Sequence, residues 1–559
     1  MTALNTIPTT WTFAALAVVL LATGCAGRSG APDRAPAFTA EGFNGHVQVL
    51  ASDEFEGRRP ASAGEEKTVA YLEQQFRAWG LQPGTPGGFR QPVPVLELTA
   101  LPADELRVAG PRGELVLRYG DDAVYWTTRP VREVALEASE LVFVGYGIVE
   151  PQYGWNDYAG IDMRGKTAVI LVNDPGFATG DPELFKGRAM TYHGRWTYKF
   201  EEASRQGAAG AIIVHEDEPA AYPWEVVRNG AVKPQLLIDE PGRDGYRIAI
   251  EGWVTRGSAE RLFAAAGLDF ETQKREAAVR GFRAVPLELR ASTSVRNAIR
   301  RATSSNVVAV LPGRERPDEF VLYTAHWDHF GRALAFGGDA VFNGAIDNAT
   351  GTAALLELAQ AFSEVRPRPE RSVLFVAFTG EEYGLLGSEY FAAHPTVPLA
   401  SVAGGVNMDG LYLAGRTHDL TVFGIGSSEL EDSLRESAAR QGRVLRPEPT
   451  PEKGYYYRSD HFNLARRGVP MLYVKSGIDV VGKGETYGRQ WAADYVAQRY
   501  HKPSDEFDPT WDVSGVLEDL ALYFDVGYRL ARDTAFPAWY PGNEFRPIRE
   551  QSRAAAAAK

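Results

Sequence analysis

Five short motifs of acids, histidines and amides lie between residues 326 and 501, each at the end of an expected strand or in the turn that follows it. Carboxylates and imidazoles brought from several strand ends to one sheet edge suit a pair of divalent metal ions, because each ion takes two or three protein ligands and keeps a position for water. The pattern therefore predicts a metal-dependent hydrolase. In chain order the motifs are His326-Trp327-Asp328-His329, Asp347-Asn348, Glu381-Glu382, Asn407-Met408-Asp409 and Tyr500-His501.

The segments between these motifs alternate in the manner of an α/β fold. Residues 372–378 and 402–406 are nearly continuous apolar runs, whereas residues 351–362 and 513–532 carry apolar side chains at helical spacing. Strands that are apolar throughout are buried on both faces, which implies helices on each side of a parallel or mixed sheet. In such folds the ligand site lies at the carboxyl ends of the strands, where the motifs fall.

Each motif also has a structural interpretation when taken alone. Asp347-Asn348 ahead of a helix resembles an N-terminal cap, and Glu381-Glu382 at a helix start would offset the helix dipole. Asp409 followed by glycine would close a turn, while Asp328 stands where it can orient the imidazole of His326. Five such motifs in this order after successive strands favour the metal site.

The motif order resembles metallopeptidase family 28, which contains double-zinc aminopeptidases and glutamate carboxypeptidase-like enzymes. The resemblance covers most of the chain, because residues 52–64 and 80–83 look like the N-terminal segment of that family. It implies a zinc-exopeptidase fold, with a mixed central sheet flanked by helices. Residues 132–276 resemble the β-rich protease-associated (PA) domain that is inserted in some members.

The same resemblance implies a role for each motif residue and two Zn²⁺ per chain. One zinc would be held by His326, Asp347 and Asp409, and the other by Asp347, Glu382 and His501, so that Asp347 bridges them. Glu381 would act as general base on peptide substrates, and Tyr500 would donate to the oxyanion. An aminopeptidase is favoured; the alternatives are a carboxypeptidase-type member, a catalytically silent binding protein and a glutaminyl cyclase-like acyltransferase with a single zinc.

The charges of the motif loops favour recognition of the amino end of a peptide. No Arg or Lys occurs in the loops, so acids such as Glu381 and Asp409 would attract a protonated α-amine. Arg458 and Lys502 in flanking loops are the basic residues able to reach inward. The loops considered are residues 325–331, 343–351, 379–387 and 407–410.

The expected domain order places a peptidase domain on both sides of the insert. The insert contains His193 and His215, but neither has a spaced partner, so both are expected to be core or surface histidines. The expected segments are residues 1–25 as a signal peptide, 26–42 as a linker, 43–131 and 277–545 as the peptidase domain, 132–276 as the insert and 546–559 as a flexible tail.

Cys25 is the only cysteine, which excludes an intrachain disulfide and a thiolate metal site in the body of the chain. The apolar stretch 11–22 is too short to span a bilayer, and with Cys25 it resembles a bacterial lipoprotein signal. Lipidation of Cys25 would anchor the chain to the outer membrane or cell envelope; the alternative is an ordinary cleaved secretory peptide. Both interpretations predict export.

The net charge excludes one class of partner. The 72 acidic residues outnumber the 59 basic ones and give a formal charge of -13. A protein with this net charge lacks the excess of basic residues that is typical of nucleic-acid-binding proteins. The sequence leaves the oligomeric state open.

Overall fold

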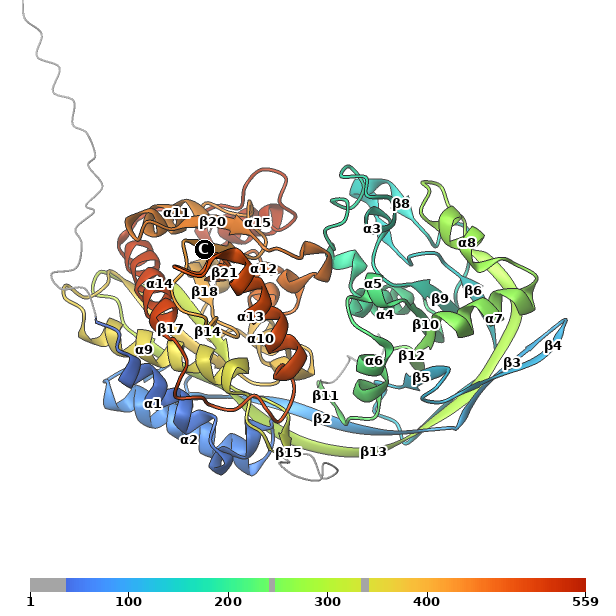
Figure 1. Ribbon diagram of the computed structural model, residues 1–559, viewed down its shortest axis with the longest axis horizontal. Coiled ribbons are helices and arrows are strands. Elements are labelled where there is room, and N and C mark those ends of the chain that lie inside the picture. Colours follow the sequence, from blue (N-terminus) through green and yellow to red (C-terminus); the bar gives the residue numbers. More distant parts are fainter. Residues whose placement is uncertain (1–36, 241–246, 333–340, 559) are drawn as a thin grey trace, which may run out of the picture. The chain divides into compact units, whose positions relative to one another are not determined.

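The computed structural model describes residues 37–240, 247–332 and 341–558 (Figure 1). Cys25 and the expected signal segment lie outside the described residues and stay predictions. Helix α1 (Ala40–Leu50) begins inside the expected linker, because the Thr39 side chain accepts a hydrogen bond from the Gly42 N–H and caps the helix. No helix in the described part of the chain is long and apolar enough to cross a membrane.

A mixed sheet forms the centre of the C-terminal half. Four strands, β17 (Arg371–Phe378), β14 (Arg316–His326), β18 (Val402–Asn407) and β21 (Met471–Ser476), run parallel in that order. The end of β13 (Val285–Leu311) pairs antiparallel with β17 on one side, and β1 (Gln82–Pro83) pairs with β13. On the other side β19 (Asp419–Val422) pairs antiparallel with β21, and β20 (Val444–Pro447) follows it.

Both faces of this sheet are buried, as its apolar runs predict. Val321 and Tyr323 of β14 belong to one apolar core, and Leu322 between them belongs to the core on the opposite face. Successive side chains of a strand point to opposite faces, so helices must cover each side. The first face is covered by α1, α2 (Ala63–Ala78), α9 (Thr350–Glu364), α11 (Leu430–Arg440) and α14 (Ser514–Arg532), and the second by α10 (Leu386–Ala393) and α12 (His461–Ala465).

A long two-stranded ribbon joins this half to the inserted part of the chain. Strand β2 (Arg90–Pro102) pairs with β13 without interruption from Arg90 opposite Val307 to Pro102 opposite Val295. Figure 1 shows the two strands running beneath both groups of elements. β13 therefore contributes its first residues to the insert and its last residues to the peptidase sheet.

The insert is rich in strands and has two apolar cores of its own. The strands β6, β9, β10 and β12 run parallel, and β5 pairs antiparallel with β12. The elements are β3 (Glu105–Gly110), β4 (Gly113–Arg118), β5 (Ala123–Trp126), β6 (Glu133–Phe143), β9 (Thr167–Leu171), β10 (Gly210–His215), β12 (Ile250–Thr255), α4 (Trp196–Arg205), α6 (Trp224–Ala231), α7 (Arg256–Ala266) and α8 (Phe270–Ala277). A further strand, β11 (Gln235–Ile238), pairs with β2.

The cores of the insert extend beyond the expected interval of residues 132–276. Leu106 and Tyr125 on one side, and Leu287 and Val295 on the other, belong to the same apolar cluster as residues of that interval. The reason is that β3 and β6 both pair with the first part of β13, so the flanking strands complete the core. Residues 546–557, expected as a tail, form helix α15 (Arg546–Ala557), and Arg549 donates to the Val402 carbonyl at 2.7 Å.

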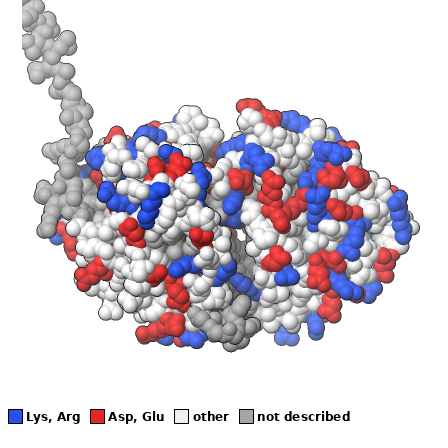
Figure 2. Space-filling model, in the orientation of Figure 1, with Lys and Arg blue, Asp and Glu red and all other residues white. Residues whose placement is uncertain are grey.

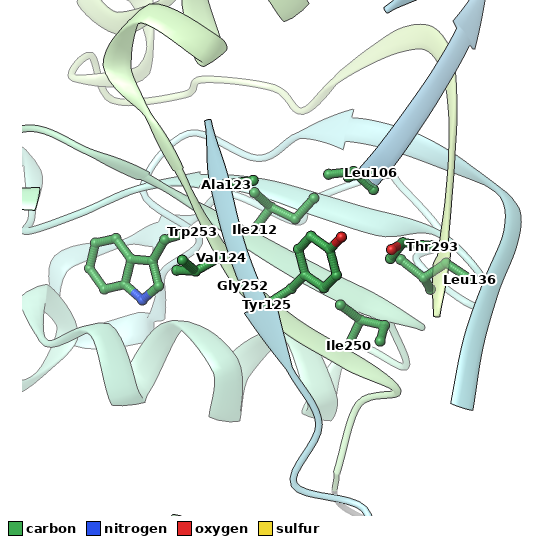
Figure 3. Close-up of a pocket in the computed structure, with 10 residues that line it drawn as sticks. All are labelled: Leu106, Ala123, Val124, Tyr125, Leu136, Ile212, Ile250, Gly252, Trp253 and Thr293. Atoms are coloured by element: carbon green, nitrogen blue, oxygen red, sulfur yellow. The ribbon is translucent and has the colours of Figure 1, made fainter. Parts of the chain in front are cut away.

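A small pocket lies within the insert (Figure 3). Its walls come mainly from strands β5 and β12, and it has no room for a water molecule. The Tyr125 hydroxyl, which would be its main polar group, donates to the Ala103 carbonyl at 2.6 Å. The pocket is a packing feature of the insert core.

Candidate metal centre

The motif residues lie at one edge of the central sheet. β14 ends at His326, β17 leads through Thr379 and Gly380 to Glu381, and β18 leads to Asp409. These strands are parallel neighbours, so their carboxyl ends meet at the same edge. Asp347 comes from the turn before α9, and His501 from the segment that follows α13 (Gly484–Gln498).

Asp347 stands between two histidines. Its Oδ1 lies 3.3 Å from Nε2 of His326, and its Oδ2 lies 3.3 Å from Nε2 of His501. Each carboxylate oxygen therefore faces a different imidazole. This is the arrangement that a carboxylate shared by two cations requires.

Each of the two glutamates faces a different one of these histidines. Glu381 Oε2 lies 3.9 Å from Nε2 of His326, whereas Glu382 Oε2 lies 3.2 Å from Nε2 of His501. They stand on a single short 3-10 turn, Glu381–Tyr383, which begins after Gly380 at φ 65° and ends before Gly384 at φ 106°. Left-handed backbone at both ends favours glycine and allows so tight a turn.

The surroundings of His326 and His329 fit a metal site. Nε2 of His326 is buried and has no hydrogen-bond partner, although Asp347, Glu381 and Asp409 place carboxylate oxygens 3.3 to 3.9 Å away. Nδ1 of His329 lies 2.5 Å from Glu382 Oε1, and its Nε2 is also buried without a partner. Donor atoms suited to a cation form two groups, His326 with Glu381 and Asp409, and His329 with Asp347 and Glu382.

The electrostatics show that the cluster lacks positive charge. Burial raises the pKa of Glu381 well above its ordinary range, and Asp409 and Glu382 push it further against the opposing effect of His326. Against the effect of burial, Glu382 and Asp347 raise the pKa of His501 to about 9. Burial opposes ionisation of Glu382, but His501 and His329 still lower its pKa to about 2. The histidines bind protons where a metal ion would supply the charge.

Comparison with known proteins shows which family the segment with the metal centre is similar to. Residues 306–525 match peptidase family M28. We call this matched segment the M28 domain. The match contains all the motif residues from His326 to His501.

Relatives of the M28 domain include zinc proteases and aminopeptidases. A probable zinc metalloprotease of Pyrenophora tritici-repentis (strain Pt-1C-BFP) is 37% identical over 257 residues, which cover 43% of this chain and 57% of its own. Aminopeptidase NAALADL1 of Mus musculus is 35% identical over 102 residues, 18% of this chain and 12% of its own. The chain thus spans 57% of the length of the first relative and 12% of the second.

The solved structure of an aminopeptidase from Aneurinibacillus sp. strain AM-1 shares the fold. It superposes with a TM-score of 0.50 and 21% sequence identity, over 88% of this chain and 93% of that one. The expected mixed sheet flanked by helices is confirmed. The M28 assignment made from the motif order is confirmed as well.

The cap interpretation of Asp347-Asn348 applies to the second residue of the pair. The Asn348 Oδ1 accepts hydrogen bonds from the N–H groups of Gly351 at 2.9 Å and Gly410 at 3.0 Å. Its Nδ2 donates to the carbonyls of His326 and Met408. One buried amide thereby fixes three motif loops of the M28 domain and leaves the Asp347 carboxylate free to face the histidines.

Asp505 supports Asp347 and has no counterpart among the residues expected from the sequence. Its buried carboxylate accepts hydrogen bonds from the N–H groups of Ile346 and Asp347, each at 3.1 Å to Oδ2. It follows His501 by four residues in a loop, which is the one local signal for it. The resemblance assigns no role to His329, so its contact with Glu382 is a second omission.

Arg58 links the N-terminal segment to the loops of the metal centre. Its side chain is 1% exposed, within the 3-10 segment Asp53–Arg58. Its guanidinium donates to the carbonyls of Leu50, Trp327, Asn343 and Gly344 at 2.6 to 2.8 Å. Arg58 therefore attaches the N-terminal segment to two loops of the metal centre.

Tyr500 lies over His501 at the opening of the site. The rings stack with centroids 3.7 Å apart, and Tyr500 keeps 39% of its surface exposed. His501 has φ 57°, a left-handed conformation that residues other than glycine rarely adopt. The hydroxyl of Tyr500 has no hydrogen-bond partner among the described residues, so it is available to a ligand.

His193 and His215 lie in the insert as structural residues. His193 Nε2 lies 3.1 Å from the carboxylate of Glu150, and His215 Nε2 lies 3.1 Å from the Tyr222 carbonyl. Neither belongs to a group of metal-binding side chains among the described residues. Over the face of the molecule in Figure 2, acidic and basic side chains are interspersed.

Proposed function

We propose that this protein is a zinc-dependent exopeptidase that removes residues from the amino end of peptides. The observation that carries the proposal is the sharing of Asp347 between His326 and His501, with Glu381 and Glu382 directed to the two sides. His326, Asp347 and Asp409 would hold one Zn²⁺, and Asp347, Glu382 and His501 the other. His329 places a further donor atom beside Asp347 and Glu382.

Zinc in such a centre supplies an acidified water and a charge that polarises the peptide carbonyl. The protein residues supply the proton transfers. Glu381 would accept the proton of the attacking water and return it to the leaving amine. The free hydroxyl of Tyr500 would donate a hydrogen bond to the developing oxyanion.

Asp328 would act as a positioning residue. Its carboxylate is fully buried, and Oδ1 lies 3.7 Å from Nδ1 of His326. Because Nε2 of the same ring faces the carboxylates of the centre, Asp328 would hold the ring in the orientation for ligation.

Recognition of the amino end follows from the excess of acids. Glu381, Asp409 and Asp347 surround one imidazole, and a protonated α-amine would bind beside these acids, next to the scissile bond. Hydrolysis of leucine p-nitroanilide and of its N-acetyl form, with metal analysis of the same sample, tests this proposal. Equal turnover of the blocked compound would contradict amine recognition, and a single tightly bound zinc would favour the cyclase-like alternative.

We also propose that the insert is a protease-associated domain that restricts access without providing chemistry. Its separate cores and the contacts of His193 and His215 support this division. Loss of turnover with intact metal content in His193→Ala or His215→Ala would contradict it.

Export by a lipoprotein signal is a further proposal. It rests on the sequence around Cys25 alone. Metabolic labelling with palmitate tests it: the wild type is expected to be labelled, and Cys25→Ser is expected to lose the label.

A further inference from the structure

We propose that the neighbouring residues His329 and Phe330 position the two ligands that belong to the second zinc alone, Glu382 and His501. The His329 side chain contacts the glutamate, and the Phe330 ring contacts the histidine. The proposal rests on the two-zinc centre proposed above and adds two positioning residues to it. This dipeptide would then set the affinity of one of the two metal sites.

The distances among the donor atoms separate ligands of one ion from atoms that contact each other directly. Two ligand atoms that lie about 2.0 to 2.1 Å from one zinc ion, at tetrahedral angles, are roughly 3.3 Å apart. Nε2 of His501 fits this value, at 3.3 Å from Asp347 Oδ2 and 3.2 Å from Glu382 Oε2. Nδ1 of His329, in contrast, lies 2.5 Å from Glu382 Oε1. At that separation the two atoms form a direct hydrogen bond, and no ion fits between them.

The contact with His329 decides which oxygen of Glu382 is left for the metal. An ionised carboxylate only accepts hydrogen bonds, so Nδ1 of His329 is the donor to Oε1. Oε2 is the oxygen that faces His501. The two oxygens therefore have separate partners, and the bond from His329 fixes the rotation of the carboxylate group.

The imidazole of His329 is itself held by close packing. It is fully buried, and the backbone N–H of the same residue donates to the Arg58 carbonyl at 3.3 Å. Its ring lies against Gly344, where a Cβ would come within 2.6 Å of the ring atoms Cγ and Cδ2. Gly344 has φ 52°, so both the space and the backbone favour glycine there. This packing keeps the donor directed to Glu382.

His501 needs a contact from outside its own segment. It follows helix α13, in which Gly488 is the one fully buried residue of the described helix, and its side chain is 34% exposed. Tyr500, which stacks on it, is exposed as well. The Phe330 ring approaches His501 from another loop, with ring centroids 4.8 Å apart and ring planes at 76°. An edge-to-face contact of this kind favours one orientation of the ring.

Phe330 is fixed by residues of both the M28 domain and the insert. Its ring lies 6.0 Å from that of Phe342 and 6.2 Å from that of Tyr383, the last residue of the turn with the two glutamates. Lys233 of the insert places its Nζ 4.3 Å from the centroid of the Phe330 ring. Tyr383 in turn packs against Leu236 of strand β11. The insert thus supports the second site by packing and supplies no ligand to it.

The ligands of the first zinc have other supports. Asp328 Oδ1 lies 3.7 Å from Nδ1 of His326. Asn348 accepts a hydrogen bond from the N–H of Gly410, the residue that follows Asp409. Changes in the dipeptide are therefore expected to weaken one site and to leave the other as it is.

Zinc titration of the metal-free full chain, in competition with a chromogenic chelator, measures the two sites separately. The binding step that His501→Ala removes identifies the second site. His329→Asn and His329→Gln form a matched pair, because the Asn amide nitrogen takes the place of Nδ1 of the imidazole and the Gln nitrogen that of Nε2. His329→Gln is expected to weaken the second site by about tenfold to a hundredfold, and His329→Asn is expected to keep its affinity within about threefold.

A second pair of variants tests the aromatic contact. Phe330→Leu removes the ring and keeps an apolar side chain, so the affinity of the second site is expected to fall by about threefold to tenfold, the scale of one aromatic pair. Phe330→Tyr keeps the ring and is expected to bind zinc as the wild type does. The readout is the ratio of the two affinities within one protein, so a general loss of stability does not imitate the effect.

Specific outcomes would overturn the proposal. One is an unchanged second site in either His329→Gln or Phe330→Leu, and another is an equal loss at both sites. Loss of a zinc in His329→Asn, with both retained in His501→Ala, would make His329 a ligand and overturn its positioning role. A wild type with one zinc would overturn this proposal together with the two-zinc centre, whereas two bound zinc ions without peptide hydrolysis would contradict the exopeptidase function alone.

Discussion

The backbone N–H of Glu381 donates a hydrogen bond to Oδ1 of Asp328 over 3.1 Å. The same oxygen lies 3.7 Å from Nδ1 of His326. One buried carboxylate therefore contacts both an imidazole of the metal centre and the first residue of the turn that carries the two glutamates. The relation explains how neighbouring residues, Glu381 and Glu382, are directed reproducibly to different histidines.

Substitution of Glu381 by Gln is expected to remove proton transfer while leaving the metals bound. We expect kcat to fall by about two to four orders of magnitude, the usual contribution of a general base. Glu382→Gln is the matched control and is expected to lower the zinc content, because Glu382 faces both His501 and His329. Near-native activity of Glu381→Gln would remove Glu381 from the base role.

Metal stoichiometry tests the shared carboxylate. The purified protein is expected to contain two zinc ions per chain, by elemental analysis after dialysis. Asp347→Ala is expected to impair both sites, since its oxygens face both histidines, whereas His501→Ala is expected to affect mainly one. One tight metal that persists in Asp347→Ala would contradict the bridging assignment.

Asp328→Asn is expected to weaken metal binding without removing any ligand. Loss of such a supporting carboxylate typically costs about tenfold to a hundredfold in affinity. Competition with a chromogenic chelator measures the change, and the thermal unfolding temperature of the zinc-loaded protein reports whether the fold is retained. Unchanged zinc affinity would show that the His326 ring is oriented by other contacts.

Arg58→Ala is expected to destabilise the protein by about 3 kcal/mol or more. The substitution leaves four buried carbonyls, those of Leu50, Trp327, Asn343 and Gly344, without their donor. Chemical unfolding of the metal-free protein measures the loss. Arg59→Ala is the neighbouring control, since Arg59 is partly exposed and pairs with Glu97; an equal loss in the two variants would contradict the special role of Arg58.

Glu65 is expected to make stability depend on pH. Burial raises its pKa to about 7, against the hydrogen bonds that it accepts from Ala61 and Ser304. The folded state therefore holds a proton more tightly than the unfolded state, and its contribution is complete below about pH 4.5 and lost as the pH rises through 7.

The unfolding free energy of Glu65→Gln is expected to rise relative to the wild type by up to about 3 kcal/mol between these pH values. Glu66→Gln removes an exposed acid of the same helix and serves as the control. A wild type and a Glu65→Gln protein with parallel pH profiles would contradict the raised pKa.

The sheet and the position of the site were predictable because their signals are local. Apolar runs such as residues 372–378 mark strands that are buried on both faces, and the polar residue after each run marks the carboxyl end. Arg58 was not predictable, because its acceptors Trp327 and Gly344 lie 269 and 286 residues away in the chain. Asp505 and His329 acquire their partners only when separate loops meet.

The bounds of the insert could not be predicted from the sequence, because they too depend on long-range contacts. The strands at residues 105–126 have a sequence pattern that is common to β-strands in general. Only their pairing with β13 and β12 assigns them to the insert. Helix α15 was not predictable, because it has few large apolar side chains and is held by Arg549, which donates to a backbone carbonyl of a distant segment.

Strand β13 runs for 27 residues and belongs to both halves of the molecule. Its pairing with β2 has no break between the two halves, so the connection contains no unpaired segment in these strands. A division of the chain for independent expression of the halves would cut both β13 and β2. Each fragment would then carry two strand ends with unpaired backbone groups, which favour aggregation.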